Sequence, residues 1–249
     1  MAFYNYDDYY YRKPKYESVS ERKNKVEEYI KKMAAKGVQF SPVRITGASI
    51  AKKWWGLMWC KNLERYSDYA NRIPRGKSYC KNGNVIDLNI DEGKIKALVM
   101  GSAKKPYIIE VDIDPMDKIK SSEISSTCSK KIHNVESLVQ GDFPKDMEEL
   151  FFSENGLFPS PKEIHFFCMC PDSAKMCKHV ASVLYAVGAK FDDDPLLFFK
   201  LRGIDINTLV AKAIDNRLEN LLANAENKTP RIYDEANVED LFGLKEYDC

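Results

Sequence analysis

The stretch from Ser78 to Ile113 alternates between apolar and polar residues, which is the pattern of half-buried β-strands. The turn-forming sequences Asn82-Gly83, Asp91-Glu92-Gly93 and Gly101-Ser102 divide it at hairpin spacing. The apolar positions of the three strands are Ile86, Leu88 and Ile90, then Ile95, Ala97 and Val99, then Tyr107, Ile109, Val111 and Ile113. We therefore expect an antiparallel β-meander in which consecutive strands pair.

Two helices are predicted before this sheet. Ser18 and Glu21 form a capping-box pattern that opens the first helix, and Gly37 ends it. The second helix extends from about Ser49 to Tyr66 and should pack on the sheet through an apolar stripe, although a stacking platform for bases is an alternative. The stripe consists of Trp54, Trp55, Met58, Trp59 and Leu63.

Helical patterns dominate the chain after the sheet. They cover about 128–140 and 144–152, and further helices are expected to begin near Cys177 and Asp205. The predicted fold class is α+β, with an antiparallel β-meander packed by helices and followed by a mostly helical region.

The same patterns predict five parts along the chain. Residues 1–16 form a mobile Tyr-rich arm and 17–116 an α+β domain. Residues 117–129, rich in Ser and Lys, form a linker or exposed loop. Residues 130–225 form the helical region, and 226–249 an acidic tail. The arm offers Tyr4, Tyr6, Tyr9, Tyr10 and Tyr11 as candidate partner-binding residues, because tyrosine supplies a large amphipathic contact area.

Charge is distributed unevenly in spite of a net charge of only +1. Residues 1–110 hold 22 Lys and Arg against 12 Asp and Glu, whereas residues 111–249 hold 16 against 25. This division suggests a basic half that faces nucleic acid and an acidic half that meets a protein partner. The alternative is that the surfaces of the two halves merely differ in charge.

A cluster of cysteine and histidine residues provides the most specific chemical signal. Cys168-Met-Cys170 is followed, after six residues, by Cys177-Lys-His179. Three thiolates and one imidazole are the donor set of a structural zinc ion, and four protein ligands leave no open position for catalysis. Buried cysteines or a redox pair are the alternatives, and His165 is a less favoured substitute ligand.

Basic residues near the predicted sheet and the metal cluster are candidate nucleic-acid contacts, with an ordinary solvated surface as the alternative. They are Arg72, Arg75, Lys77, Lys81, Lys104, Lys105, Lys175 and Lys178. No Gly-rich phosphate loop, G-x-S-x-G elbow or H-E-x-x-H motif is present, so we expect neither an enzyme nor a small-molecule substrate. A signal peptide and a membrane span are also lacking, which makes the cytoplasm the expected location.

The sequence CMCPDSAKMCKH resembles the SWIM zinc finger, and the resemblance continues through FDDDPLLFFKLRG from Phe191 to Gly203. RGKSYCKNGNV from Arg75 and VMGSAKKPYIIEV from Val99 are similar to the bacterial stand-alone SWIM proteins. The resemblance implies a ββα zinc knuckle over about 163–190, one structural Zn²⁺, and a role in binding DNA or protein. It also implies a Snf-type helicase-like ATPase, or other DNA-remodelling machinery, as the partner.

Two functions follow as hypotheses. One is a nucleic-acid-associated accessory factor that works with such an ATPase. The other is a protein-protein adaptor with no direct nucleic-acid contact. The charge asymmetry slightly favours an adaptor with one basic face over a pure nucleic-acid binder, whose overall pI would usually be higher than 7.5.

Overall fold

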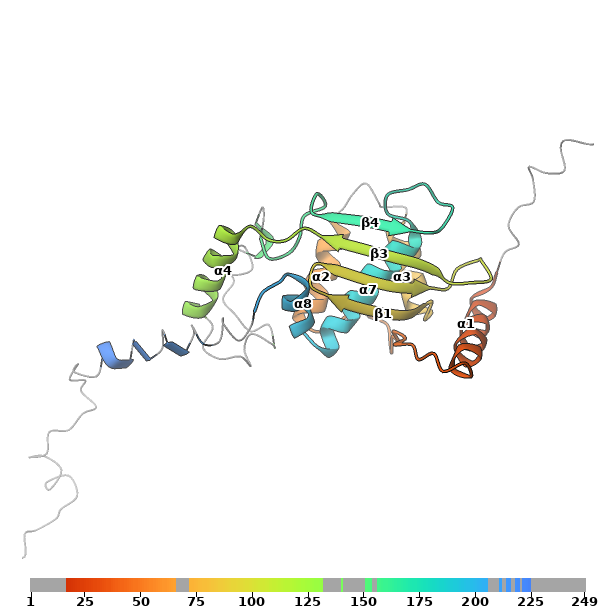
Figure 1. The fold of residues 1–249 in the computed structure, drawn as a ribbon, viewed down its shortest axis with the longest axis horizontal. Coiled ribbons are helices and arrows are strands. Elements are labelled where there is room, and N and C mark those ends of the chain that lie inside the picture. Colours follow the sequence, from red (N-terminus) through yellow and green to blue (C-terminus); the bar gives the residue numbers. More distant parts are fainter. Residues whose placement is uncertain are drawn as a thin grey trace, which may run out of the picture.

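A four-stranded antiparallel sheet lies at the centre of the computed structural model, with several helices packed behind it (Figure 1). The structure describes residues 17–65, 72–131, 140, 151–153 and 156–205, together with 211, 214–215, 218–219 and 221–224. The α+β fold class is confirmed. The Tyr-rich arm, the acidic tail and most of the helical patterns predicted after residue 131 lie outside the described residues.

The sheet has the order β1-β2-β3-β4, and each neighbouring pair is antiparallel. Its strands are β1 (Val85–Asp91), β2 (Lys94–Val99), β3 (Tyr107–Ile113) and β4 (Ile164–Cys168). The first three form the predicted meander. The β1–β2 turn contains Gly93 at a φ of 62°, a conformation that favours glycine.

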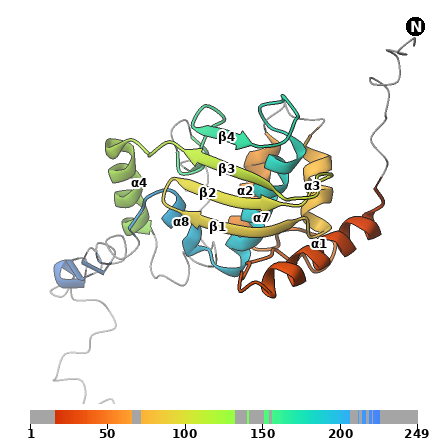
Figure 2. The ribbon, with the colours of Figure 1, turned by 45° about the vertical axis from the view of Figure 1, so that its right-hand side comes forward.

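Helix α7 (Lys178–Asp193) packs against all four strands on one side and against α2 and α3 on the other. All of its residues from His179 to Ala189 are buried. Two glycines permit the close helix contacts: a Cβ on Gly56 would lie 2.3 Å from the carbonyl oxygen of Gly188, and one on Gly76 would lie 2.4 Å from Cβ of Ala181. Figure 2 shows α7 between the sheet and the helices behind it.

Helix α2 (Trp54–Glu64) carries the predicted aromatic stripe, but it packs on α7 and α8 (Leu196–Leu201). The prediction that the stripe packs directly on the sheet is therefore wrong, because α7 occupies that face. Trp55 is fully buried, 4.9 Å from the ring of Phe198, and the indole of Trp59 donates a 2.8 Å hydrogen bond to the carbonyl of Leu184. These two rings are core residues, so the alternative of a base-stacking platform does not hold for them.

Helix α1 (Val19–Ala34) confirms the predicted capping box. The Ser18 hydroxyl accepts from the Glu21 N–H at 3.2 Å, and the Glu21 carboxylate accepts from the Ser18 N–H at 2.7 Å. Its apolar residues form a smaller cluster with the sheet, in which Val26 packs with Ile86 and Met100.

Two further helices correct the sequence analysis. Helix α3 (Ile73–Lys81) was not predicted, and its residues from Ser78 onward fall in the stretch that was expected to form strands. Gly76 weakens the local helix signal, whereas packing on α7 requires this glycine. Helix α4 (Lys118–Lys131) replaces most of the predicted linker or exposed loop. The carboxylate of Asp117 caps it by accepting from the N–H groups of Ile119 and Lys120, at 2.9 and 3.1 Å.

The predicted boundary after residue 116 does not divide the core. β4 belongs to the second predicted part, yet it pairs with β3 of the first, with Ile109 opposite Cys168. Residues from both parts also share one hydrophobic cluster. The metal-binding segment is thereby fixed to the central sheet.

Candidate metal centre

The four predicted ligands come together where β4 leads into α7. β4 ends at Cys168, Cys170 lies just beyond it, Cys177 is the N-cap of α7, and His179 lies in the first turn of that helix. Their ligand atoms all lie within 4.8 Å of one another. The Cys168, Cys170, Cys177 and His179 group could therefore hold one metal ion.

The geometry suits zinc. Tetrahedral zinc with Zn–S bonds of about 2.3 Å and Zn–N bonds of about 2.0 Å holds its sulfur and nitrogen ligands roughly 3.6 Å apart. Nδ1 of His179 lies 3.8 Å from Sγ of Cys177 and 4.0 Å from Sγ of Cys168. Three sulfurs and one nitrogen make a closed set, typical of a structural site.

The thiols differ in acidity. A hydrogen bond with Cys168, together with His179 and the N–H of Val180, lowers the pKa of Cys177 to about 4. The same hydrogen bond with Cys177, and then burial, raises the pKa of Cys168. Burial raises the pKa of the Cys170 thiol. The lowered pKa belongs to the thiol at the N-terminus of α7, where the helix dipole also favours negative charge.

Residues that the sequence analysis did not single out as functional enclose the imidazole. The ring of His179 lies 4.7 Å from that of Tyr107 and 5.5 Å from that of Tyr79. Its Nε2 is buried without a hydrogen-bond partner in the part of the chain that the structure describes. A Cβ on Gly101 would lie 2.9 Å from this Nε2, so the absence of a side chain there makes room for the ligand. All three neighbours lie in the two segments that resemble the bacterial stand-alone SWIM proteins, from Arg75 and from Val99, but no ligand-type residue in those segments marks a role beside the metal.

Asp172 stabilises the loop between the two ligand pairs. Its carboxylate accepts a 3.2 Å hydrogen bond from the N–H of Ala174 and forms an ion pair of 3.1 Å with Arg72 before α3. His165, the substitute ligand, is not part of the metal group, and its Nε2 lies 3.0 Å from the carboxylate of Asp114.

The predicted basic residues fall into two sets. Four make intramolecular contacts: Arg72 with Asp172, Lys77 with Glu64 at 3.3 Å, Lys81 with the carbonyl of Ala48, and Lys178 with the Tyr79 ring at 5.0 Å. The other four, Arg75, Lys104, Lys105 and Lys175, are exposed, and none of them forms an ion pair with a described residue. Lys104 and Lys105 belong to the β2–β3 loop that also contains Gly101, beside the imidazole ligand.

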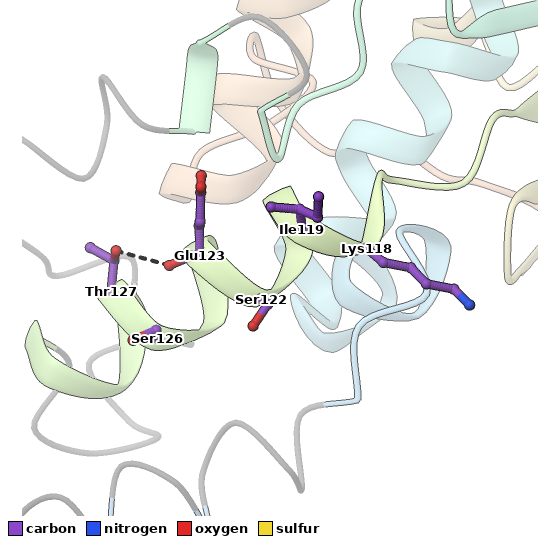
Figure 3. A pocket seen from close by; sticks show the side chains of 6 residues that line it. All are labelled: Lys118, Ile119, Ser122, Glu123, Ser126 and Thr127. Atoms are coloured by element: carbon purple, nitrogen blue, oxygen red, sulfur yellow. Dashed lines mark hydrogen bonds between the residues drawn. The ribbon is translucent and has the colours of Figure 1, made fainter.

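A second feature, beside α4, lacks comparable chemistry. A hollow of about 630 Å³ is lined by side chains of this one helix, among them Lys118, Glu123 and Thr127. Figure 3 shows Lys118 pointing away from the others and the Thr127 hydroxyl bonded to the carbonyl of Glu123, at 2.9 Å. One lysine and one carboxylate that point apart do not define a binding site.

None of the helices in the described part of the chain combines the length and the apolar character that a membrane span needs.

Comparison with known proteins gives one relative and no family. The chain is similar to Uncharacterized protein Rv2102 of Mycobacterium tuberculosis, with 35% identity over 170 residues. The alignment covers 68% of this chain and 61% of that protein. No protein-family model matches the chain, and no solved structure matches it. The case for a function therefore depends on the residues of the metal centre and its surroundings.

Proposed function

We propose that this protein is a non-enzymatic zinc-binding module of the SWIM type that associates with nucleic acid, in complex with a Snf-type helicase-like ATPase or other DNA-remodelling machinery. The observation that carries the proposal is the complete Cys3His group, with all ligand atoms within 4.8 Å of one another. A closed four-ligand site supports a structural role for the metal.

Zinc in this position would join three segments: the end of β4, the loop that follows it, and the first turn of α7. Because β4 and α7 also pack in the main core, zinc should order the loop from 169 to 177 and not the whole fold. A rigid loop would hold Lys175 at a fixed place relative to Lys104 and Lys105.

The nucleic-acid part of the proposal is supported by the exposed cations near the metal. We call Lys104, Lys105 and Lys175 the metal-proximal basic surface. The structure gives none of these three an ion-pair partner among the described residues, so phosphates would not have to displace a carboxylate. Contacts of this kind are sensitive to salt and carry little sequence information.

Metal analysis tests the first part. One zinc per chain is expected, and Cys170→Ala should abolish tight binding while Cys60→Ala, at a cysteine outside the group, should not. Chelation should speed hydrogen exchange in 169–177 and leave β1 to β3 protected. Equal loss of protection in both regions would contradict a local role for zinc.

Charge reversal tests the second part. The triple variant Lys104→Glu, Lys105→Glu, Lys175→Glu should weaken binding of duplex DNA and reduce the slope of log affinity against log salt by about 2.7, at roughly 0.9 per phosphate contact. The matched control reverses Lys96, Lys118 and Lys162, which are exposed lysines outside the metal-proximal basic surface. Equal effects of the two triple variants would remove the metal-proximal surface from the proposal.

The adaptor function is a second candidate, favoured by an apolar patch beside the metal. Ile108, Phe167 and Met169 are 44%, 54% and 59% exposed. They lie on the same face of the sheet, since Phe167 pairs with Glu110 and the N–H of Met169 bonds the carbonyl of Ile108. Exposed apolar clusters of this kind are typical of protein interfaces.

Copurification distinguishes the two functions. An ATPase that remains bound after nuclease treatment and is lost in Phe167→Ser supports the adaptor. An association that nuclease abolishes supports the nucleic-acid function.

A further inference from the structure

A basic cleft lies at the other end of α7 from the metal centre. It has a volume of about 580 Å³ and is formed between the segment before α2 and the last turns of α7. The 16 residues of α7, at about 1.5 Å per residue, place this cleft roughly 20 Å from the ligands. The cleft is therefore separate from the metal-proximal basic surface.

Four cations line the cleft: Arg44, Lys52, Lys53 and Lys190. Within the described residues, none of them forms an ion pair, in contrast to Arg72 and Lys77 elsewhere on the surface. Like charges gathered in one hollow repel each other unless an anion neutralises them. The cleft thus carries positive charge that the fold itself leaves unmatched.

The two carboxylates of the cleft only partly offset this charge. Asp192 is already engaged, because its two carboxylate oxygens accept from the main-chain N–H groups of Lys52 and Lys53, the latter at 3.0 Å. Asp193 is exposed. Asp192 therefore holds the Lys52–Lys53 segment against α7. In total, four cationic side chains and two carboxylates line the cleft.

Neutral hydrogen-bond donors lie at the same rim. The hydroxyls of Thr46 and Ser49 line the cleft, and Gly47 between them has a φ of 97°. The main-chain N–H groups from Thr46 to Ser49 donate no hydrogen bond within the described part of the chain. Lys81 holds this turn through the carbonyl of Ala48. Main-chain N–H groups exposed at a turn, together with hydroxyls, are recurrent donors to phosphate oxygens.

Apolar side chains in the cleft strengthen the attraction between its cations and an anion. Val43 and Ile50, both buried, and Ala189 form part of the wall. A wall of low polarity focuses the field of the cations into the cleft. Its volume lies within the range of small-molecule sites and exceeds what a single phosphate needs.

We propose that this cleft binds a ligand with two or more phosphate groups. Polyphosphate compounds and a nucleic-acid strand share that chemistry. The inference does not depend on the proposed nucleic-acid role of the metal-proximal surface, because no residue is common to the two sites.

Binding assays with inorganic tripolyphosphate and with a labelled single-stranded 12-mer DNA test the proposal. The double variant Lys52→Gln, Lys190→Gln should weaken the wild-type affinity for one or both probes at least tenfold. The Lys52→Gln substitution keeps the main-chain N–H that donates a hydrogen bond to Asp192. For the 12-mer, the salt slope should fall by about 1.4, at roughly 0.7 for each lost contact on a single strand.

The matched control is Lys96→Gln, Lys162→Gln, which removes the same charge elsewhere. Melting temperature and zinc content check the fold, and Arg44→Gln, at an exposed residue, replaces the double variant if that variant is unstable. Weakening of the tripolyphosphate complex identifies a small polyphosphate ligand, and weakening of the 12-mer complex alone identifies a strand.

The proposal is overturned if neither probe binds the wild-type protein, or if the cleft variant and the control behave alike. The triple charge reversal at the metal-proximal surface separates the two hypotheses. It should leave tripolyphosphate binding unchanged, whereas the cleft variant should weaken 12-mer binding further in that background.

Discussion

Zinc binding at pH 7 is predicted to release about two protons per ion, because ligands must be deprotonated to bind the metal. The three thiols start from different states. The pKa of Cys177 is lowered to about 4 by its hydrogen bonds with Cys168, His179 and a main-chain N–H, so this group is already a thiolate. The pKa values of Cys168 and Cys170 are raised, which keeps both protonated.

The pH dependence follows from this count. Each thiol with a raised pKa must lose a proton when zinc binds, so affinity rises with pH. Two such groups make the affinity increase about 100-fold between pH 7 and pH 8. Cys177 contributes nothing to this increase in affinity, because its lowered pKa of about 4 lies well below the interval from pH 7 to pH 8.

Calorimetric titration of the metal-free protein with zinc in buffers of different ionisation enthalpy measures the proton count. The variant Cys170→Ala should release about one proton with weaker binding, whereas Cys60→Ala, at a cysteine outside the group, should still release about two. Release of three protons from the wild type would show that either the Cys177 thiolate or the neutral imidazole of His179 is not formed beforehand. Release of none would show that the thiols are not the ligands.

Three other changes test the fold and the surroundings of the metal. Trp55→Ala should lower the free energy of unfolding by about 3–5 kcal/mol because its ring is fully buried, whereas Leu57→Ala, 39% exposed on the same helix, should cost under about 1 kcal/mol in urea denaturation. Gly101→Ala should weaken zinc binding about 10- to 100-fold in competition with a chromophoric chelator, since the added methyl would crowd the imidazole, while Ser102→Ala, at its exposed neighbour, should not. Deletion of residues 1–16 should leave zinc content and melting temperature unchanged, because α1 has its own cap, but should weaken copurification with a partner; a loss of the fold would assign the arm to the core.

Local patterns in the sequence were sufficient to predict a structural feature wherever the interactions that determine it lie within a few residues. The capping box of Ser18 and Glu21, the hairpin turn at Gly93 and the donor set from Cys168 to His179 are of this kind. Each depends on a spacing that brings its own atoms together, whatever the rest of the chain does. The helix at Lys118–Lys131 was also signalled locally, by Asp117 as its cap, but serine-rich composition favoured a loop.

The tertiary structure alone decided how these parts meet. β4 pairs with β3 across the predicted domain boundary, and α7 takes the sheet face that the tryptophan stripe was expected to cover. It also decided which cations remain without a carboxylate: Lys77 lies beside Glu64, whereas Lys52 and Lys190 line a cleft. Pairing, burial and charge matching depend on distances between residues far apart in the chain, and those distances arise only when the apolar surfaces of α7, α2 and the sheet are buried together.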